Sequence, residues 1–156
     1  MNGISLSRLA LVHPALRYRV TNFLTALPFD TEVTQGLRTW AEQDALYAQG
    51  RTVPGIIVTN ARGGYSMHNM GGAIDIVPED ITPGQPDWNL NHPAWKTILQ
   101  MALKFGLAEG AQWAEDVDSP HLYLQELPAT PTDQMRSDFS AGGLPQVWAA
   151  WRIGNV

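Results

Sequence analysis

The sequence predicts a small α+β domain in which a short antiparallel sheet is flanked by helices. The 156 residues have the length of one ordinary domain. Helical and strand patterns follow one another without the regular alternation of a parallel doubly wound sheet. No internal repeat, low-complexity tract or linker-like charge run interrupts the chain. We therefore expect a single domain over residues 1–156.

Helix and strand signals order the first part of the chain. Pro14 suits the first turn of a helix, and an apolar stripe at helical spacing follows it up to the next proline. Alternation over residues 31–36 predicts a short strand. Thr39 and Glu42 form a capping box, which predicts a helix over residues 40–49.

The second part begins with a loop rich in Gly, Asn, Ser and Thr at residues 51–72. A loop of that length inside a compact domain is usually functional. The apolar run AIDIV at residues 73–77 and the segment HLYL at 121–124 predict strands. Pro93 opens a helix between them.

The C-terminal tail, residues 128–156, predicts one or two short helices, the last around residues 147–151. Trp148 and Trp151 have the spacing of one helical face. We expect these two rings to pack against the protein and not to stack on a sugar.

Composition excludes several classes of protein. A hydrophobic fraction of 44% with 16% charged residues excludes a disordered chain. A net charge of -5 without a Lys/Arg cluster argues against a nucleic-acid partner. No apolar run approaches the roughly 20 residues of a membrane span, and the first residues lack the pattern of a secretory signal. We expect a monomer that is made in the cytoplasm without a signal peptide.

Histidines are the strongest chemical candidates, because the chain has no cysteine and any metal must be held by His, Asp or Glu. His13 and His92 each precede a proline at a helix entrance, so we predict capping or packing roles. His68 stands before two glycines in the long loop, and His121 lies on a predicted strand. Asp75 lies in the middle of an apolar strand, where a carboxylate is costly unless it is paired or binds a metal.

Two imidazoles, one buried carboxylate and a further carboxylate at Asp118 match a catalytic zinc site with three ligands, an open position and a general base. Each residue alone has an ordinary explanation as a salt-bridged Asp or a core His. The spacing by itself does not establish that residues 68–75 and 115–121 meet in space. Glu115 and Asp116 compete with Asp118 as the candidate base.

The pattern Ser66-x-His68-x6-Asp75, followed by Asp118-x-x-His121, resembles the zinc peptidases of the VanY/D-alanyl-D-alanine carboxypeptidase group (peptidase M15). Within that group it is most similar to the phage L-alanyl-D-glutamate endopeptidases. The resemblance covers roughly residues 5–127 and leaves the tail unmatched. Further matching segments are Val12-His13-Pro14-x-Leu16, Gly36-Leu37-Arg38-Thr39, Gln43-x-x-Leu46-Tyr47-x-Gln49-Gly50-Arg51-Thr52 and Gly106-Leu107…Gly110-x-x-Trp113.

The resemblance implies that His68, Asp75 and His121 bind zinc and that Asp118 is the catalytic carboxylate. It implies that Arg38 contacts the substrate or the developing oxyanion. The implied fold is the small α+β type shared with the hedgehog signalling domain.

The chain departs from the family pattern in two places. Leu122 follows His121 where an aromatic residue is common, and Asp118 stands where many relatives have Glu. Two roles stay open. Arg38 either stabilises negative charge or forms an ordinary surface ion pair, and Ser66 either hydrogen-bonds the substrate or orders its loop.

The predicted function is a zinc-dependent peptidoglycan endopeptidase of the endolysin type. It would hydrolyse a stem-peptide bond, expected to be L-alanyl-D-glutamate, with a metal-activated water and Asp118 as general base. In a phage lysis context it would reach the cell wall through a partner pore. The alternatives are a D-Ala-D-Ala carboxypeptidase or dipeptidase, and a non-catalytic zinc-containing binding module.

Overall fold

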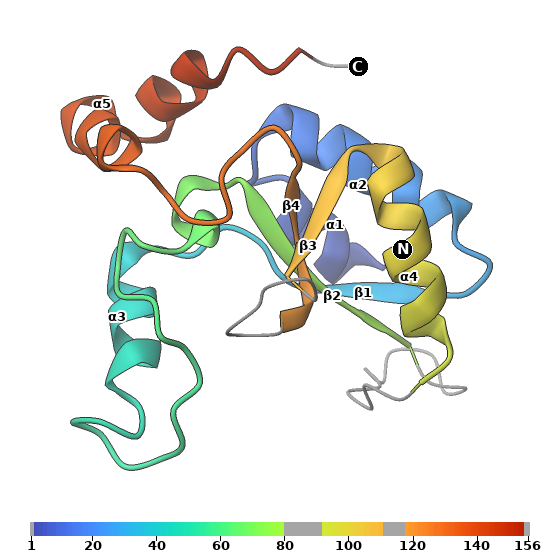
Figure 1. The fold of residues 1–156 in the computed structure, drawn as a ribbon, viewed down its shortest axis with the longest axis horizontal. Helices are drawn as coiled ribbons and strands as arrows, with labels where there is room; N and C mark the ends of the chain where they lie inside the picture. The colour runs from blue at the N-terminus through green and yellow to red at the C-terminus, as the bar shows by residue number, and fades with distance from the viewer. Residues whose placement is uncertain (1, 80–91, 111–117, 155–156) are drawn as a thin grey trace.

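The computed structural model describes residues 2–79, 92–110 and 118–154, with side chains left out at 118–120. At its centre is a four-stranded antiparallel sheet with the strand order β1-β2-β4-β3 (Figure 1). The strands are β1 (Thr31–Gln35), β2 (Ala73–Pro78), β3 (Leu107–Gly110) and β4 (Asp118–Leu124). The predicted α+β class with a short antiparallel sheet is confirmed.

The helices lie on two sides of this sheet. Figure 1 shows α1, α2 and α4 together on one side, and α3 and α5 with the turn η1 on the other. The helical elements are α1 (Gly3–Leu9), α2 (Pro14–Ala26), α3 (Trp40–Ala48), η1 (Met67–Met70), α4 (Ala94–Ala102), η2 (Leu103–Phe105) and α5 (Asp133–Trp151), of which η1 and η2 are 3-10 turns.

The sheet has an apolar face that packs against the first group of helices. Ile74 of β2 pairs with Leu122 of β4, and both side chains are fully buried. Leu16 and Phe23 of α2 and Ile98 of α4 belong to the same core cluster. Since side chains alternate along a strand, the residues next to Ile74 and Leu122 face the opposite side. Those residues are Asp75 and His121.

Local signals explain most helix starts. Pro14 is the first residue of α2, and the side chain of His13 accepts a hydrogen bond from the backbone N–H of Ala15. His92 accepts one from the N–H of Ala94 at the start of α4. Both capping predictions are confirmed. The capping box of Thr39 and Glu42 is also present.

One α-helix and one strand were missing from the sequence prediction. α1 spans Gly3–Leu9 and β3 spans Leu107–Gly110, whereas the first firm element was expected at Pro14. The segment LAEG has neither strong β propensity nor a long alternation, so only its pairing with β4 defines it as a strand.

α5 consists of two helical parts separated by a kink, which agrees with the prediction of one or two helices in the tail. Gly142 and Gly143 leave the helical conformation inside it, and Gly143 has φ 66°. Pro145 follows in the second part. Val147 is fully buried, so the second part packs against the rest of the protein. In the described segments, no helix has the length and apolar character needed to cross a membrane.

Candidate metal centre

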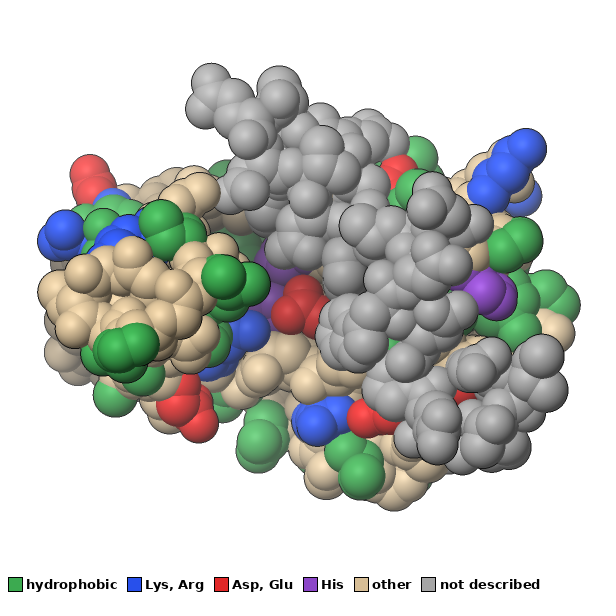
Figure 2. Space-filling model, turned by 90° about the horizontal axis from the view of Figure 1, so that it is seen from below, with side chains coloured by type: hydrophobic (Ala, Val, Ile, Leu, Met, Phe, Trp, Pro, Cys, Tyr) green, Lys and Arg blue, Asp and Glu red, His purple; other side chains and the backbone are tan. Residues whose placement is uncertain are grey.

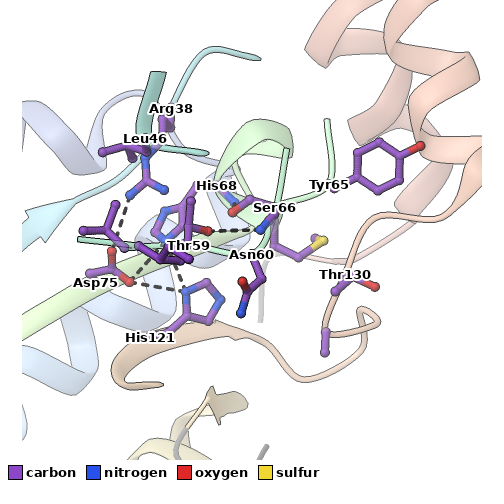
Figure 3. Close-up of a pocket in the computed structure, with 15 residues that line it drawn as sticks. Arg38, Leu46, Thr59, Asn60, Tyr65, Ser66, His68, Asp75, His121 and Thr130 are labelled. Atoms are coloured by element: carbon purple, nitrogen blue, oxygen red, sulfur yellow. Dashed lines mark hydrogen bonds and ion pairs between the residues drawn. The ribbon is translucent and has the colours of Figure 1, made fainter. Parts of the chain in front are cut away.

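Three side chains that are distant in sequence meet on the polar side of the sheet (Figure 3). His68 Nε2 lies 3.1 Å from Asp75 Oδ1 and 3.1 Å from His121 Nδ1, and His121 Nδ1 lies 3.3 Å from Asp75 Oδ1. The two imidazoles are 3% and 5% exposed and the carboxylate 20% exposed. One atom from each residue therefore faces a common point.

The sheet positions two of these groups. Asp75 on β2 and His121 on β4 are register partners in the antiparallel ladder. Directly opposed residues hold their Cβ atoms about 4.5–5.5 Å apart on the same face. The backbone pairing therefore brings these two side chains together before any side-chain interaction is made.

A turn outside the sheet positions the third. His68 lies in η1, where the Ser66 hydroxyl accepts a hydrogen bond from the His68 N–H and caps the turn. The Nδ1 atom of the ring lies 2.8 Å from the carbonyl oxygen of Gly36. The carbonyl of His68 accepts a hydrogen bond from the Arg38 N–H at 3.1 Å. The chain leaving β1 thus orients the histidine from two sides.

The hydrogen bond to Gly36 also determines which nitrogen of the imidazole can bind a cation. A carbonyl oxygen only accepts, so His68 Nδ1 carries the proton. In the neutral ring, Nε2 then directs a lone pair at the carboxylate of Asp75. That arrangement requires a positive charge between the two atoms, either a proton or a metal ion.

The donor set fits a tetrahedral metal ion. One proton bridges two of the three converging atoms, whereas a cation binds all three. Zinc bonds of about 2.0–2.1 Å in a tetrahedron give ligand–ligand distances of about 3.3 Å, and the three separations are 3.1–3.3 Å. Two imidazoles and one carboxylate suit zinc, while calcium and magnesium prefer oxygen ligands alone. The His68–Gly36 hydrogen bond is the second contact by which metal-binding histidines are commonly oriented.

The electrostatics of Asp75 favour the ionised ligand. Burial raises the pKa of the Asp75 carboxyl, whereas the charges and hydrogen bonds of His68 and His121 lower it. The lowering is larger, so the net pKa lies well below its ordinary value. Arg38 adds positive charge, with its guanidinium 3.7 Å from Asp75 Oδ2. Asp75 is therefore ready to bind a cation across the whole neutral range.

Arg38 is held in place by a buried amide that was not singled out as a site residue. The guanidinium donates to Gln43 Oε1 at 2.8 Å, and Gln43 Nε2 donates to the carbonyl of Ala61 at 2.9 Å. Gln43 is fully buried and Arg38 is 14% exposed. Arg38 is therefore not an ordinary surface ion pair. The signal for Gln43 was present in the sequence only as part of the family resemblance.

A cavity of about 730 Å³ opens onto the three converging side chains. In Figure 2 a red acidic surface and a purple histidine surface lie together in a hollow. Apolar lining comes from Leu46, Ile57 and Val58, and polar lining from Ser66 and Thr130. Figure 3 shows Thr130 entering from the chain that follows β4. The tail thus contributes to the cavity, which the sequence did not predict.

The structure brings most of the predicted site residues together. His68, Asp75 and His121 form the group of potential metal ligands, and Arg38 and Ser66 line the same cavity. Ser66 orders its loop through the cap on η1. The side chain of Asp118 and all of Glu115 and Asp116 lie outside the described residues, so the choice of base stays a prediction.

Fold and site together define a class: an α+β protein in which a His-Asp-His group that could hold a metal ion lines a cavity. Comparison of the sequence with protein families is more specific. Residues 18–117 match the VanY model, described as D-alanyl-D-alanine carboxypeptidase, and the chain belongs to this family.

Among characterised proteins, the chain is similar to the peptidoglycan L-alanyl-D-glutamate endopeptidase CwlK of Bacillus subtilis (strain 168). The two are 39% identical over an alignment of 102 residues, with a coverage of 61% of this chain and 60% of that protein. The alignment therefore spans less than two thirds of the relative.

Solved structures share the fold. The L-Ala D-Glu endopeptidase ChiX of Serratia marcescens has a TM-score of 0.60 at 24% identity, covering 80% of this chain and 88% of that one. A variant of the vancomycin resistance D,D-pentapeptidase VanY, solved in complex with Zn(II), has a TM-score of 0.56 at 14% identity. That match covers 90% of this chain and 83% of the other.

Proposed function

We propose that this protein is a zinc-dependent peptidoglycan endopeptidase that hydrolyses the L-alanyl-D-glutamate bond of the stem peptide. The observation that carries the proposal is the convergence of His68, Asp75 and His121 beside Arg38 at a cavity large enough for a peptide. The similarity to CwlK supports the choice of bond. Family membership supports a peptidase acting on the cell wall.

The chemistry assigns a role to each residue. His68, Asp75 and His121 would hold the zinc ion, which when bound would lower the pKa of a water molecule to about 7. Asp118 accepts the proton of the attacking water and returns it to the amine that leaves. Arg38 places a permanent positive charge where the oxyanion of the substrate develops. Gln43 holds the Arg38 guanidinium through its amide oxygen.

The open cavity supports cleavage within a chain. It is lined by Leu46 and the 57–61 segment, by Ala129 and Thr130, and by the three potential metal ligands. An endopeptidase must accommodate substrate on both sides of the scissile bond. A D-Ala-D-Ala carboxypeptidase, the second candidate that family membership supports, needs to enclose only a chain end.

The test is digestion of purified cell walls followed by mass analysis of the muropeptides. Cleavage after L-alanine releases fragments with a new N-terminal D-glutamate. Liberation of free D-alanine in its place would assign the protein to the carboxypeptidases. The His68→Ala variant is the control for a contaminating activity. Muropeptides that remain unchanged after incubation with the zinc-loaded protein would contradict both enzymatic functions.

Peptidoglycan lies outside the cytoplasmic membrane, so we further propose that the protein acts there after release or export, in a lytic role. Clearing of a cell-wall suspension by the purified protein would support lysis. Soluble fragments without clearing would indicate remodelling and contradict the lytic role.

A further inference from the structure

The C-terminal tail (residues 128–156) lies outside the residues matched by the family model, which end at 117. Its helix α5 nevertheless contacts η1, the turn that carries His68. The indole N–H of Trp148 in α5 donates a hydrogen bond of 2.7 Å to the carbonyl of Met70, the last residue of η1. This bond joins positions separated by 78 residues. It ends two residues after His68.

The backbone at this point is shaped to receive the indole ring. Gly71 follows η1 in the left-handed conformation with φ 66°. A Cβ atom at Gly71 would lie 2.9 Å from Cζ2 of Trp148, so the ring covers the face of the glycine. The carbonyl of Gly71 accepts a hydrogen bond of 2.8 Å from the N–H of His13. The His13 ring in turn packs edge-on against Trp148, with centroids 5.4 Å apart.

The first part of α5 contacts α3 and the loop that precedes η1. The ring of Phe139 stacks on that of Trp40, with centroids 4.8 Å apart and an interplanar angle of 19°. The guanidinium of Arg136 lies 4.1 Å from the ring centroid of Tyr65, which lines the cavity. α5 therefore contacts the loop on both sides of His68.

We propose that α5 is a positioning element of the metal centre, in which Trp148 holds the His68 turn in the conformation that binds zinc. The sheet already fixes Asp75 and His121 through backbone pairing. His68 lies on a short turn, and a 3-10 turn of this length has little stability of its own. Restraining that turn before the ion arrives removes an ordering cost from metal binding. The inference rests on the proposed metal site.

Trp151 supplies a matched control for Trp148. It belongs to the same helix, packs against the same His13 ring at 5.2 Å and touches Gly72. Its indole nitrogen, however, is buried without a hydrogen-bond partner within the described part of the chain. Replacing either tryptophan with Phe keeps an aromatic ring, but only Trp148→Phe removes a hydrogen bond to the turn.

The experiment measures zinc affinity of the full-length protein by competition with a chelator, together with melting temperatures with and without zinc. We expect Trp148→Phe to weaken zinc binding about three- to tenfold, which corresponds to one net hydrogen bond of about 1 kcal/mol. The rise in melting temperature on adding zinc should shrink accordingly. Trp151→Phe should bind zinc like the wild type.

The outcomes separate this inference from the proposed function. If the wild type binds no zinc, the metal site itself is wrong. If the wild type binds zinc and Trp148→Phe binds it equally well, the positioning role is wrong and the metal site stands. A lower melting temperature for Trp148→Phe with an unchanged zinc-induced shift also overturns the inference, because it indicates a purely structural contact.

Discussion

The sheet and the loop outside it contribute to the candidate metal centre in different ways. Asp75 and His121 are neighbours because β2 and β4 pair in register, and buried residues on the other face fix that register. His68 depends on scattered contacts: the Gly36 carbonyl, the Arg38 N–H and, through Met70, the indole of Trp148. A change in the loop can therefore alter the metal site while leaving the sheet intact.

The difference also separates binding from folding. A one-residue slip of β2 against β4 would move Asp75 to the apolar face, so the ladder enforces this pair as part of folding. η1 lies outside this ladder and is restrained by individual contacts instead. We expect the sheet-borne ligands to persist in any folded variant, and the geometry of His68 to vary with the contacts around its turn.

The largest effect is expected from removing a ligand, whichever region carries it. His68→Ala and His121→Ala should each reduce zinc content from one ion per chain to near zero and abolish activity. Affinity of the wild type should also fall at acidic pH, because imidazoles bind metal only when neutral. Metal analysis after gel filtration measures both, with His92→Ala as the histidine control. Full zinc content in His68→Ala would refute the ligand set.

The base should be separable from the ligands. Asp118→Ala should retain zinc, since His68, Asp75 and His121 remain. Its turnover should fall about 10²–10⁴-fold, the usual contribution of a positioned general base.

The competing carboxylates decide that assignment. Parallel Glu115→Ala and Asp116→Ala variants should remain close to wild-type turnover. Near-normal turnover of Asp118→Ala with collapse of Glu115→Ala would transfer the role of base to Glu115 and leave the zinc site unchanged.

Arg38 joins the two regions, because its backbone contacts His68 and its side chain approaches Asp75. We expect Arg38→Ala to lower kcat about 10²–10³-fold, the usual cost of losing one stabilising group of an oxyanion. Steady-state kinetics on a soluble stem peptide measure this effect, and Arg17→Ala on the exposed side of α2 is the control. A raised KM at unchanged kcat would show that Arg38 binds a ground-state carboxylate instead.

Most of the regular structure could be predicted from local signals. Short segments predict three elements: the helix at Pro14, the helix with the capping box at Thr39 and the strand at 73–77. All three are present. The pairing of Asp75 with His121 could not be derived from spacing, because an antiparallel partner can come from any later strand. The family resemblance supplied it, and the ladder confirms that the two are neighbours.

The part of the site that could not be predicted depends on long-range contacts. Gln43 looks like any polar helix residue until the 59–61 segment covers it. Thr130 reaches the cavity only because the chain turns back after β4. Trp148 was expected to pack, which is correct, but its partner on η1 carries no signal in the local sequence.

The turn itself can be tested at Gly71. Gly71→Ala forces a Cβ into a left-handed backbone and within 2.9 Å of the Trp148 ring. We expect a loss of about 1–3 kcal/mol in the free energy of unfolding. Urea denaturation measures it. The control is Gly3→Ala, since a Cβ there meets nothing within 4 Å. Equal stability of the two variants would show that the turn is not restrained as described.

The smallest effect concerns the sheet. Arg19 of α2 connects the residue before β3 with the chain that follows β4. Its guanidinium donates to the carbonyl of Gly106 at 2.9 Å and to both carboxylate oxygens of Glu126 at 2.7 and 2.6 Å. The hydrogen bonds from Arg19 lower the pKa of Glu126 below the ordinary 4.5. Folding therefore favours the ionised carboxylate. The Arg19–Glu126 pair stabilises the native state at pH values above the ordinary glutamate pKa of 4.5.

That contribution should disappear as the pH falls from about 4.5 through the lowered pKa of Glu126, because the carboxylate then becomes protonated in the folded state. Glu126 is 41% exposed, so solvent screening limits the contribution at neutral pH to about 1 kcal/mol or less. Glu126→Gln should lose that amount near pH 7, and its difference from the wild type should shrink as the pH is lowered below 4.5, as urea denaturation across this range would show. Zinc affinity should not change, since the hydrogen bonds of Glu126 to Arg19 do not involve η1 or a ligand. A weaker zinc site in this variant would mean that the sheet-borne ligands are as sensitive to distant contacts as His68, and the distinction between the two regions would fail.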